Sequence, residues 1–306
     1  MASSIPAQNP AETARALPTL DSTLREAVGS CYIVAYKENT QRLENALVED
    51  GFKVETLRVD YTPVELTYSR TIRCLLNHAS AWEKASRQTS YSIVVEADFV
   101  PCVGFGAMPL PFDASVHGDK AWAFLYSGGP RFFELLGDRT TPGHSSCPVA
   151  IIISPQVAAL LVEYCKEELL RHGDLTQYSL WDAAFQWHIM GKGGRCFMAY
   201  RQYGEHGGIA NREHKKAGTG FLVNLPMMFN LGIGVNHHAD TLRSPLKFLP
   251  DYARGSRFRF LRIRFEAKAL GFARLLTGRT ISIVSPMSVS AKLRLFWYSF
   301  WRLVNL

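Results

Sequence analysis

The sequence predicts an α/β fold with a mostly parallel sheet flanked by helices. Apolar runs of strand type occur at residues 31–36, 53–59 and 91–95, and helical periodicity occurs between them at 39–50 and 66–88. This strand–helix alternation is typical of a doubly wound sheet. The 306 residues are 47% hydrophobic and 20% charged, which excludes a wholly disordered or collagen-like chain. The apolar stretches are all shorter than the ~18 residues of a membrane-spanning helix, so we expect none.

The remaining elements follow from local signals. Residues 147–154 read as a strand, and Pro155 is well placed at the first turn of the helix that follows. The glycines of 190–194 end a later helix and lead into a strand from Cys196 to Tyr200. We expect three regions: a disordered segment at 1–29, a main domain at 30–250 and a basic tail at 251–306.

The positive charge is concentrated in that tail. Residues 251–306 hold eleven Lys and Arg residues and two acids, whereas the preceding 250 residues carry a net charge of −2. The tail is therefore the part that we expect to attract anionic surfaces. No base-reading module precedes it, so we expect no nucleic-acid partner.

The six cysteines form no CxxC pair. We expect buried, reduced thiols, and their spacings do not predict a zinc site.

Two carboxylates follow the third predicted strand, at Glu96 and Asp98. In a parallel sheet ligands bind beyond the carboxyl ends of the strands. Side chains at i and i+2 of an extended segment point to the same side, so the pair should project together. Paired carboxylates need a cation or a shared proton, and oxygen ligands suit Mg²⁺ or Mn²⁺. A solvated acidic loop is the alternative.

The wider context is a recognisable order of motifs. CLLNHASAW at 74–82 precedes the strand and acidic pair IVVEADFVP at 93–101, and Phe105 follows. This arrangement resembles the lipopolysaccharide-type glycosyltransferases of family 25, clearly over residues 31–105 and more faintly over 147–190. That family carries Glu-Asp-Asp where this sequence has Glu-Ala-Asp, so Ala97 is a departure.

The resemblance implies a GT-A type, Rossmann-like domain that transfers a hexose, such as galactose or glucose, from a UDP-sugar to a saccharide acceptor, with inversion. Mn²⁺ or Mg²⁺ would neutralise the departing diphosphate. Glu96, Asp98 and His206 would hold the metal. Arg70, Asn77 and His78 would contact the donor. Asp182 would be the base that accepts the acceptor's proton, with Glu205 as a second catalytic candidate.

Several of these residues have an ordinary structural interpretation as well. His78 shares a helix face with Leu75 and Trp82 and can be a core residue. Ser179 and Asp182 have the spacing of a capping box.

The stretch 201–214 is the densest polar segment, with Glu205 and His206 among glycines. It can be a mobile loop over the donor or a plain surface loop. A zinc site of His206, His214, His237 and His238 is a further alternative, although no standard spacing is met.

Residues 291–306 project as an amphipathic helix. Leu293, Phe296, Trp297, Phe300, Trp301, Leu303 and Val304 fall in one arc, and Lys292, Arg294, Ser299, Arg302 and Asn305 in the other. Aromatic residues opposite Lys and Arg are typical of a helix that lies in a membrane interface. We therefore expect an anionic membrane surface as a partner, with a helix docked on the protein's own core as the alternative.

The resemblance and the basic tail together imply a cytoplasmic transferase attached peripherally to the inner face of the cell membrane, acting on a lipid-linked cell-envelope glycan. A degenerate, membrane-tethered nucleotide-sugar or saccharide binder is the second hypothesis, and a peripheral membrane scaffold is the third.

Overall fold

The computed structural model describes residues 17–136, 140–208, 245–281 and 287–305. Within these residues an eight-stranded mixed sheet forms the centre, in the order β2-β1-β3-β8-β5-β9-β7-β6. Its strands are β1 (Val28–Ala35), β2 (Val54–Arg58), β3 (Tyr91–Glu96), β5 (Ala121–Phe124), β6 (Gly128–Phe132), β7 (Thr140–Ser146), β8 (Ala150–Ile153) and β9 (Arg195–Ala199).

The prediction of a mostly parallel sheet is confirmed, since all strands of the central sheet except β7 and β8 run in the same direction. β1 pairs in parallel with both β2 and β3, and β5 pairs in parallel with β9. β8 and β7 run against their neighbours. A second, two-stranded sheet pairs β4 (Phe99–Pro101) antiparallel with β10 (Gly204–His206).

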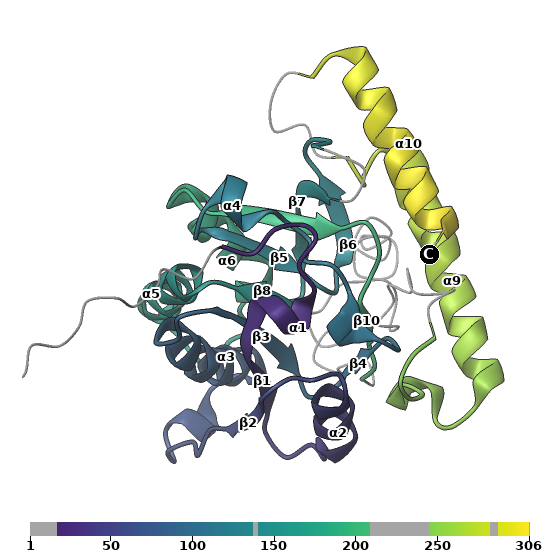
Figure 1. The fold of residues 1–306 in the computed structure, drawn as a ribbon. Helices are drawn as coiled ribbons and strands as arrows, with labels where there is room; N and C mark the ends of the chain where they lie inside the picture. The colour runs from purple at the N-terminus through teal and green to yellow at the C-terminus, as the bar shows by residue number, and fades with distance from the viewer. Residues whose placement is uncertain (1–16, 137–139, 209–244, 282–286, 306) are drawn as a thin grey trace, which may run out of the picture.

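Helices cover both faces of the sheet (Figure 1). The α-helices are α1 (Leu24–Ala27), α2 (Gln41–Glu49), α3 (Arg70–Ser86), α4 (Ala114–His117), α5 (Pro155–His172), α6 (Trp181–Gly191), α9 (Arg257–Leu276) and α10 (Val289–Asn305), and the short 3₁₀ turns are η1 (Glu65–Thr67), η2 (Phe105–Ala107) and η3 (Asp251–Ala253). No helix in these described ranges is long and apolar enough to cross a membrane.

Two apolar cores result from the alternation of side chains along the strands. One contains Leu43 and Leu47 of α2 with Ile93 and Val95 of β3. The other contains residues of α3, α5, α6 and α10, packed on Val94 and its neighbours. Glu96 follows Val94 by two residues and so lies on the α3 face of the sheet, which sets up the site described below.

Several sequence predictions need correction. The segment 1–29 was predicted to be disordered, but α1 and the start of β1 occupy residues 24–29, and Leu24 is fully buried. The helix predicted over 66–88 begins only at Arg70, because the Ser69 side chain accepts a hydrogen bond from the Ile72 N–H and caps it there. The strand predicted over 147–154 is shorter, since Cys147 has a left-handed φ of 72° that separates β7 from β8.

The capping box predicted for Ser179 and Asp182 is wrong. Leu180 is the N-cap of α6, and the Ser179 hydroxyl donates to Glu168 while accepting from the Trp181 N–H. Asp182 is therefore a first-turn residue whose carboxyl is not needed for that cap.

Candidate functional site

The acidic pair lies at the carboxyl end of β3, as the sequence predicts. The predicted extended geometry, which would point both side chains to the same side, is not formed. The chain turns at Ala97 and Asp98 directly after Glu96, so the segment is not extended there. The Ala97 N–H donates to the Val34 carbonyl, which holds the turn against β1. Glu96 faces α3, and Asp98 is carried toward β10.

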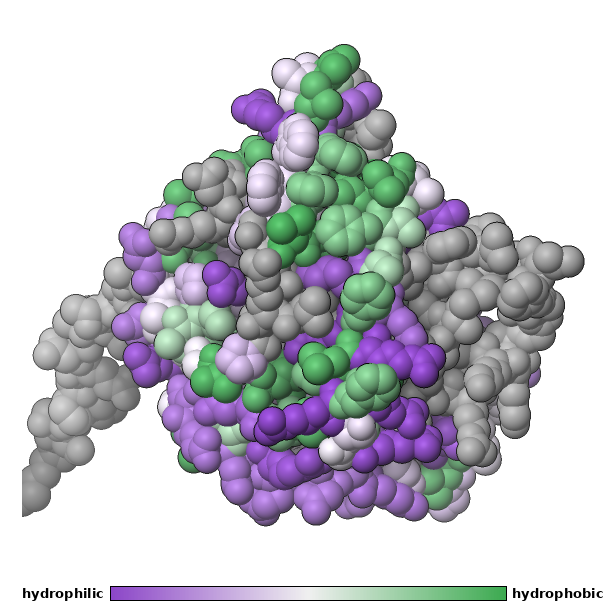
Figure 2. All heavy atoms as spheres, turned by 90° about the vertical axis from the view of Figure 1, so that its right-hand side faces the viewer, coloured by the Kyte–Doolittle hydropathy of each residue, from purple (hydrophilic) through white to green (hydrophobic). Residues whose placement is uncertain are grey.

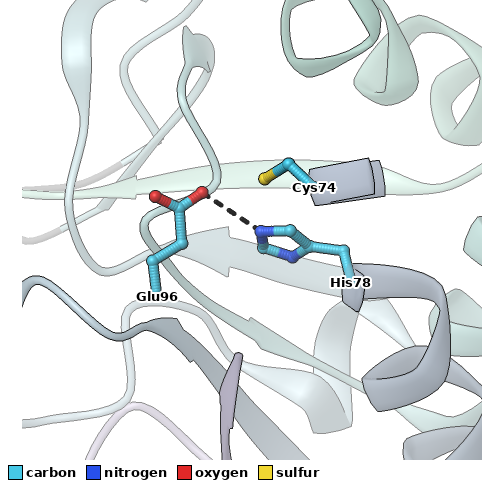
Figure 3. Close-up of side chains that lie close together, drawn as sticks. All are labelled: Cys74, His78 and Glu96. Carbon is cyan, nitrogen blue, oxygen red and sulfur yellow. Dashed lines mark hydrogen bonds and ion pairs between the residues drawn. The ribbon is translucent and has the colours of Figure 1, made fainter. Parts of the chain in front are cut away.

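Two groups of metal-ligating side chains meet at Glu96. The ligand atoms of Glu96, Asp98 and His206 all lie within 4.8 Å of one another, and so do those of Cys74, His78 and Glu96. Figure 3 shows the second group, with the His78 ring pointing from α3 toward the Glu96 carboxylate. His78 Nε2 lies 3.1 Å from Glu96 Oε1.

His206 reaches Asp98 because glycines let β10 approach the acidic turn. A Cβ on Gly208 would overlap the Asp98 carboxylate, and one on Gly207 would clash with Val100. The Gly207 N–H donates to the Asp98 carbonyl at 2.7 Å. In the described part of the 201–214 segment, Gly204–His206 form strand β10 and Gly207 and Gly208 lie against the Asp98 turn, so this part is not a surface loop. His214, His237 and His238 lie outside the described residues.

Asp98 and His206 form an ion pair in this arrangement, with 2.9 Å between Oδ2 and Nε2. Burial lowers the pKa of His206, but the carboxylates of Asp98, Glu96 and Glu205 outweigh it and raise the pKa to about 9. His206 is therefore protonated at neutral pH when no cation is present.

The donor set of Glu96, Asp98 and His206 fits a divalent cation. Within the described part of the chain, Asp98 Oδ1 is buried and has no hydrogen-bond partner, so coordination would satisfy it. Carboxylates suit Mg²⁺ and Mn²⁺, and the imidazole favours Mn²⁺ over Mg²⁺. The Cys74 group is less suited to these hard ions. Burial, followed by the charges of Glu96, Asp182 and Asp98, raises the pKa of the Cys74 thiol well above its usual value and keeps it protonated.

A cavity of about 580 Å³ opens beside these groups. It lies where β1 and β3 end, and it is lined by Val34, Ala35, Tyr36, Lys37, Glu38, Tyr61, Arg70, Arg73, Cys74, Asn77, Glu96, Ala97 and Asp98. Its size and position are those of a small-molecule site in an open α/β sheet.

The cavity wall combines cations with aromatic rings. The rings of Tyr36 and Tyr61 lie 5.4 Å apart, and the Arg73 guanidinium lies about 6 Å from both. Within the residues that are described, Arg73 Nε is buried without a hydrogen-bond acceptor. An anionic ligand in the cavity would supply one.

The predicted donor-binding residues separate into two groups. Arg70 and Asn77 line the cavity, and the Asn77 amide donates to the Ala35 carbonyl at 2.7 Å, which fixes the end of β1. His78 is fully buried behind Glu96 and packs against the rings of both Trp82 and Trp181, which also contact each other. Its position is that of a residue that orients Glu96 rather than one that contacts a ligand.

The two predicted catalytic carboxyls also differ in their surroundings. Burial and then the Glu96 charge raise the pKa of Asp182 to about 6, while the N–H groups of Asp182 and Ala183 and the charge of His78 oppose this rise. Asp182 is thus close to the acidic cluster, although it is not part of the cavity wall. Glu205 is buried and accepts a hydrogen bond from the Tyr252 hydroxyl at 2.8 Å, with Arg264 at 3.5 Å. These contacts join β10 to η3 through Tyr252 and to α9 through Arg264.

Sequence reasoning missed four residues of this site, namely Arg73, Tyr36, Tyr61 and Cys74. Arg73, Tyr36 and Tyr61 line the cavity, and the i, i+3 spacing of Arg70 and Arg73 on one helix was an available signal. Cys74 and His78 are four residues apart on α3, so they share a helix face, and this spacing was the available signal for their contact with Glu96. A scan against protein-family models gives no match, and a search of curated proteins finds no similar sequence.

Proposed function

We propose that this protein is a glycosyltransferase of GT-A type that moves a hexose from a UDP-sugar to a saccharide acceptor. The observation that carries the proposal is the cavity at the ends of β1 and β3, which brings Arg70 and Arg73 to the same space as the carboxylates of Glu96 and Asp98. A nucleoside diphosphate with a bound cation needs both kinds of group, because cationic side chains and a carboxylate-held metal share its charge. The order of motifs at 74–105 supports the same class.

In this proposal Glu96, Asp98 and His206 would hold Mn²⁺, and a cation held there would supply the positive charge that a departing diphosphate needs. His78 fixes the Glu96 carboxylate through the 3.1 Å contact. Arg70 and Arg73 bind phosphate oxygens, and the Tyr36–Tyr61 pair packs against the nucleoside. Glu205 serves as the anchor of β10 and takes no part in proton transfer.

Asp182 remains our candidate for the base. A pKa of about 6 leaves it mostly ionised near neutral pH, while its basicity exceeds that of an ordinary Asp. Inverting transfer needs one such group and no covalent sugar–protein intermediate. The acceptor is a saccharide, in our proposal a lipid-linked cell-envelope glycan on the cytoplasmic side of a membrane.

The ion pair between Asp98 and His206 favours a second candidate function. With His206 protonated, the pair neutralises Asp98 without a metal. A chain of this kind would bind a nucleotide-sugar or saccharide without catalysing transfer, which is the degenerate-binder hypothesis.

Release of UDP from a panel of UDP-hexoses, with Mn²⁺ and without acceptor, separates the two, because many transferases pass the sugar slowly to water. We expect release that needs Mn²⁺ and falls at least about 100-fold in Asp98→Asn. Asp251→Asn is the matched control, since Asp251 forms an exposed ion pair with Arg42. Donor binding without any release would favour the degenerate binder, and release that survives in Asp98→Asn would refute the metal assignment.

A further inference from the structure

The two C-terminal helices are anchored to the protein by an unusual set of buried cations. Arg264 pairs with Glu205, and Lys268 donates to the Leu303 carbonyl at 2.5 Å. Arg274 donates to the Gly129 carbonyl at 2.8 Å, and Arg302 reaches the Ala199 carbonyl and the Ser127 hydroxyl. All four are nearly or fully buried. Four of the tail's eleven cations therefore hold the helices in place and do not reach the surface.

The apolar side chains on the inner face of α10 are buried as well. Leu295 and Tyr298 of α10 belong to the core beneath it, and Tyr298 packs edge-on against Phe132. Gly271 lets Leu303 approach α9 closely. The sequence had placed Leu303 on the aromatic arc and Arg302 on the polar arc, but both face inward because the docked face is rotated from the predicted one.

The outer face of the same two helices keeps large apolar side chains in solvent. On α9, Phe258 is 79% exposed and Phe265 70% exposed, at the i, i+7 spacing of one helix face. On α10, Trp297 and Trp301 are 52% and 50% exposed at i, i+4. Exposed aromatic residues gathered in this way mark an interaction surface.

Ring contacts join the two helices into one surface. Phe272 of α9 meets Phe300 of α10 with ring centroids 6.0 Å apart, and Phe300 in turn contacts Trp297 and Trp301. Figure 2 looks onto this side and shows apolar side chains running down it, with strongly hydrophilic ones beside them. We call this the α9–α10 face.

The charges beside these rings are almost all positive. Arg257, Arg259, Arg262 and Arg294 are exposed, whereas Glu266 is the one acid within the two helices, where it pairs with Arg262. Aromatic and aliphatic side chains among arginines match the chemistry of an anionic lipid surface, in which rings enter the headgroup region and cations meet phosphates.

We propose that the α9–α10 face binds an anionic membrane surface, with Trp297, Trp301, Phe258 and Phe265 inserted and Arg257, Arg259, Arg262 and Arg294 against the headgroups. The sequence suggested such a partner from the tail as a whole. The structure narrows the binding surface to the outward side of two helices that pack against each other in antiparallel directions, and it excludes the buried cations from that surface. The inference stands independently of the proposed transfer reaction, because vesicle binding and UDP release are separate measurements.

The test is co-sedimentation of the full-length chain with vesicles of phosphatidylcholine and phosphatidylglycerol, and with vesicles of phosphatidylcholine alone. We expect binding to the anionic vesicles that weakens as salt is added. Trp297→Ala together with Trp301→Ala should lower the partition coefficient at least about tenfold. Replacing Arg257, Arg259 and Arg262 with Gln should lower it about 100-fold, at roughly 1 kcal/mol for each cation.

Trp187→Ala is the matched control, because Trp187 is 46% exposed on α6 rather than on the α9–α10 face. Circular dichroism should be unchanged in all these variants, and their melting temperatures should stay far above the assay temperature, since the replaced side chains are exposed or half-exposed. Failure to sediment with either kind of vesicle would overturn the proposal. So would a dimer in solution that the tryptophan variant dissociates without any vesicle binding, because the face would then be a contact between protein chains.

Discussion

The candidate site and the two C-terminal helices differ in how their ionisable side chains are distributed in sequence and in space. The site brings together a few titratable residues from distant segments, namely His78, Glu96, Asp98 and His206, and every one of them faces another. The C-terminal helices carry many cations that are adjacent in sequence, and the fold divides them, with Arg264, Lys268, Arg274 and Arg302 inside. Charge counted along a sequence therefore says little about charge presented by a surface, whereas a short acidic motif at a strand end predicts its position well.

The division of the tail's cations into buried and exposed ones is tested by the free energy of unfolding, where we expect the largest effect. Arg302 is 2% exposed, lies over the Phe132 ring at 5.4 Å and donates to Ala199 and Ser127. Arg302→Ala leaves these acceptors unsatisfied, so we expect a loss of about 3 kcal/mol in the free energy of unfolding. Arg294→Ala, on the exposed side of the same helix, should change it by less than about 0.5 kcal/mol. Urea unfolding measures both, and equal losses would show that α10 is not divided in this way.

The second effect concerns the ion pair of His206. Its pKa rises from 6.5 to about 9 on folding, so its contribution to stability is complete below pH 6.5 and is lost as the pH rises through 9. His206→Gln should therefore cost on the order of 2 kcal/mol near neutral pH and much less above pH 9. Unfolding of both proteins across this pH range, with a chelator present, gives the comparison. A cost that stays constant with pH would contradict the ion pair.

A smaller effect is expected for the cavity. Arg73→Ala should weaken UDP binding about tenfold, because one charge-assisted contact to a phosphate is lost. Arg87→Ala is the control, since Arg87 is exposed at the other end of α3. Titration calorimetry with UDP and Mn²⁺ would show whether the two variants differ, and equal affinities would exclude Arg73 from the phosphate site.

The smallest effect is on Asp182. Its pKa is raised from 3.8 to about 6, so the stability that it contributes is complete below pH 3.8 and is lost as the pH rises through 6. Asp182→Asn removes this loss but weakens the contacts with the N–H groups of Asp182 and Ala183, so the variant should be more stable than the native protein at neutral pH by a net amount on the order of 1 kcal/mol. Melting temperatures recorded from acidic to neutral pH should diverge. A variant that is less stable at neutral pH would mean that the ionised carboxylate is well accommodated.

The comparison also separates what sequence could and could not predict. The elements from β1 to β3 and the meeting of Glu96 with Asp98 were predictable, because local periodicity and strand-end position determine them. The contact of His206 with Asp98, 108 residues away in sequence, depends on β10 pairing with β4, and only the glycines at 204, 207 and 208 indicated a close approach.

The orientation of α10 was harder to predict. Arg302 and Leu303 are buried because they fit the surface beneath them, and a helical projection carries no information about that surface. Experiments on the site need the whole chain. Leu295 and Tyr298 of α10 belong to the core on the α3 face of the sheet, so a protein ending at residue 250 would lack part of that core.

The most direct test of the central proposal is thermal unfolding of the full-length chain with UDP, with Mn²⁺, and with both. A ligand that binds only the folded state raises the melting temperature, by an amount equivalent to about 2.7 kcal/mol at a hundredfold excess over its Kd. We predict a rise of several degrees that requires UDP and Mn²⁺ together and that is absent in Asp98→Asn. No rise in the native protein, or the same rise in Asp98→Asn, would contradict a metal–diphosphate site at Glu96, Asp98 and His206.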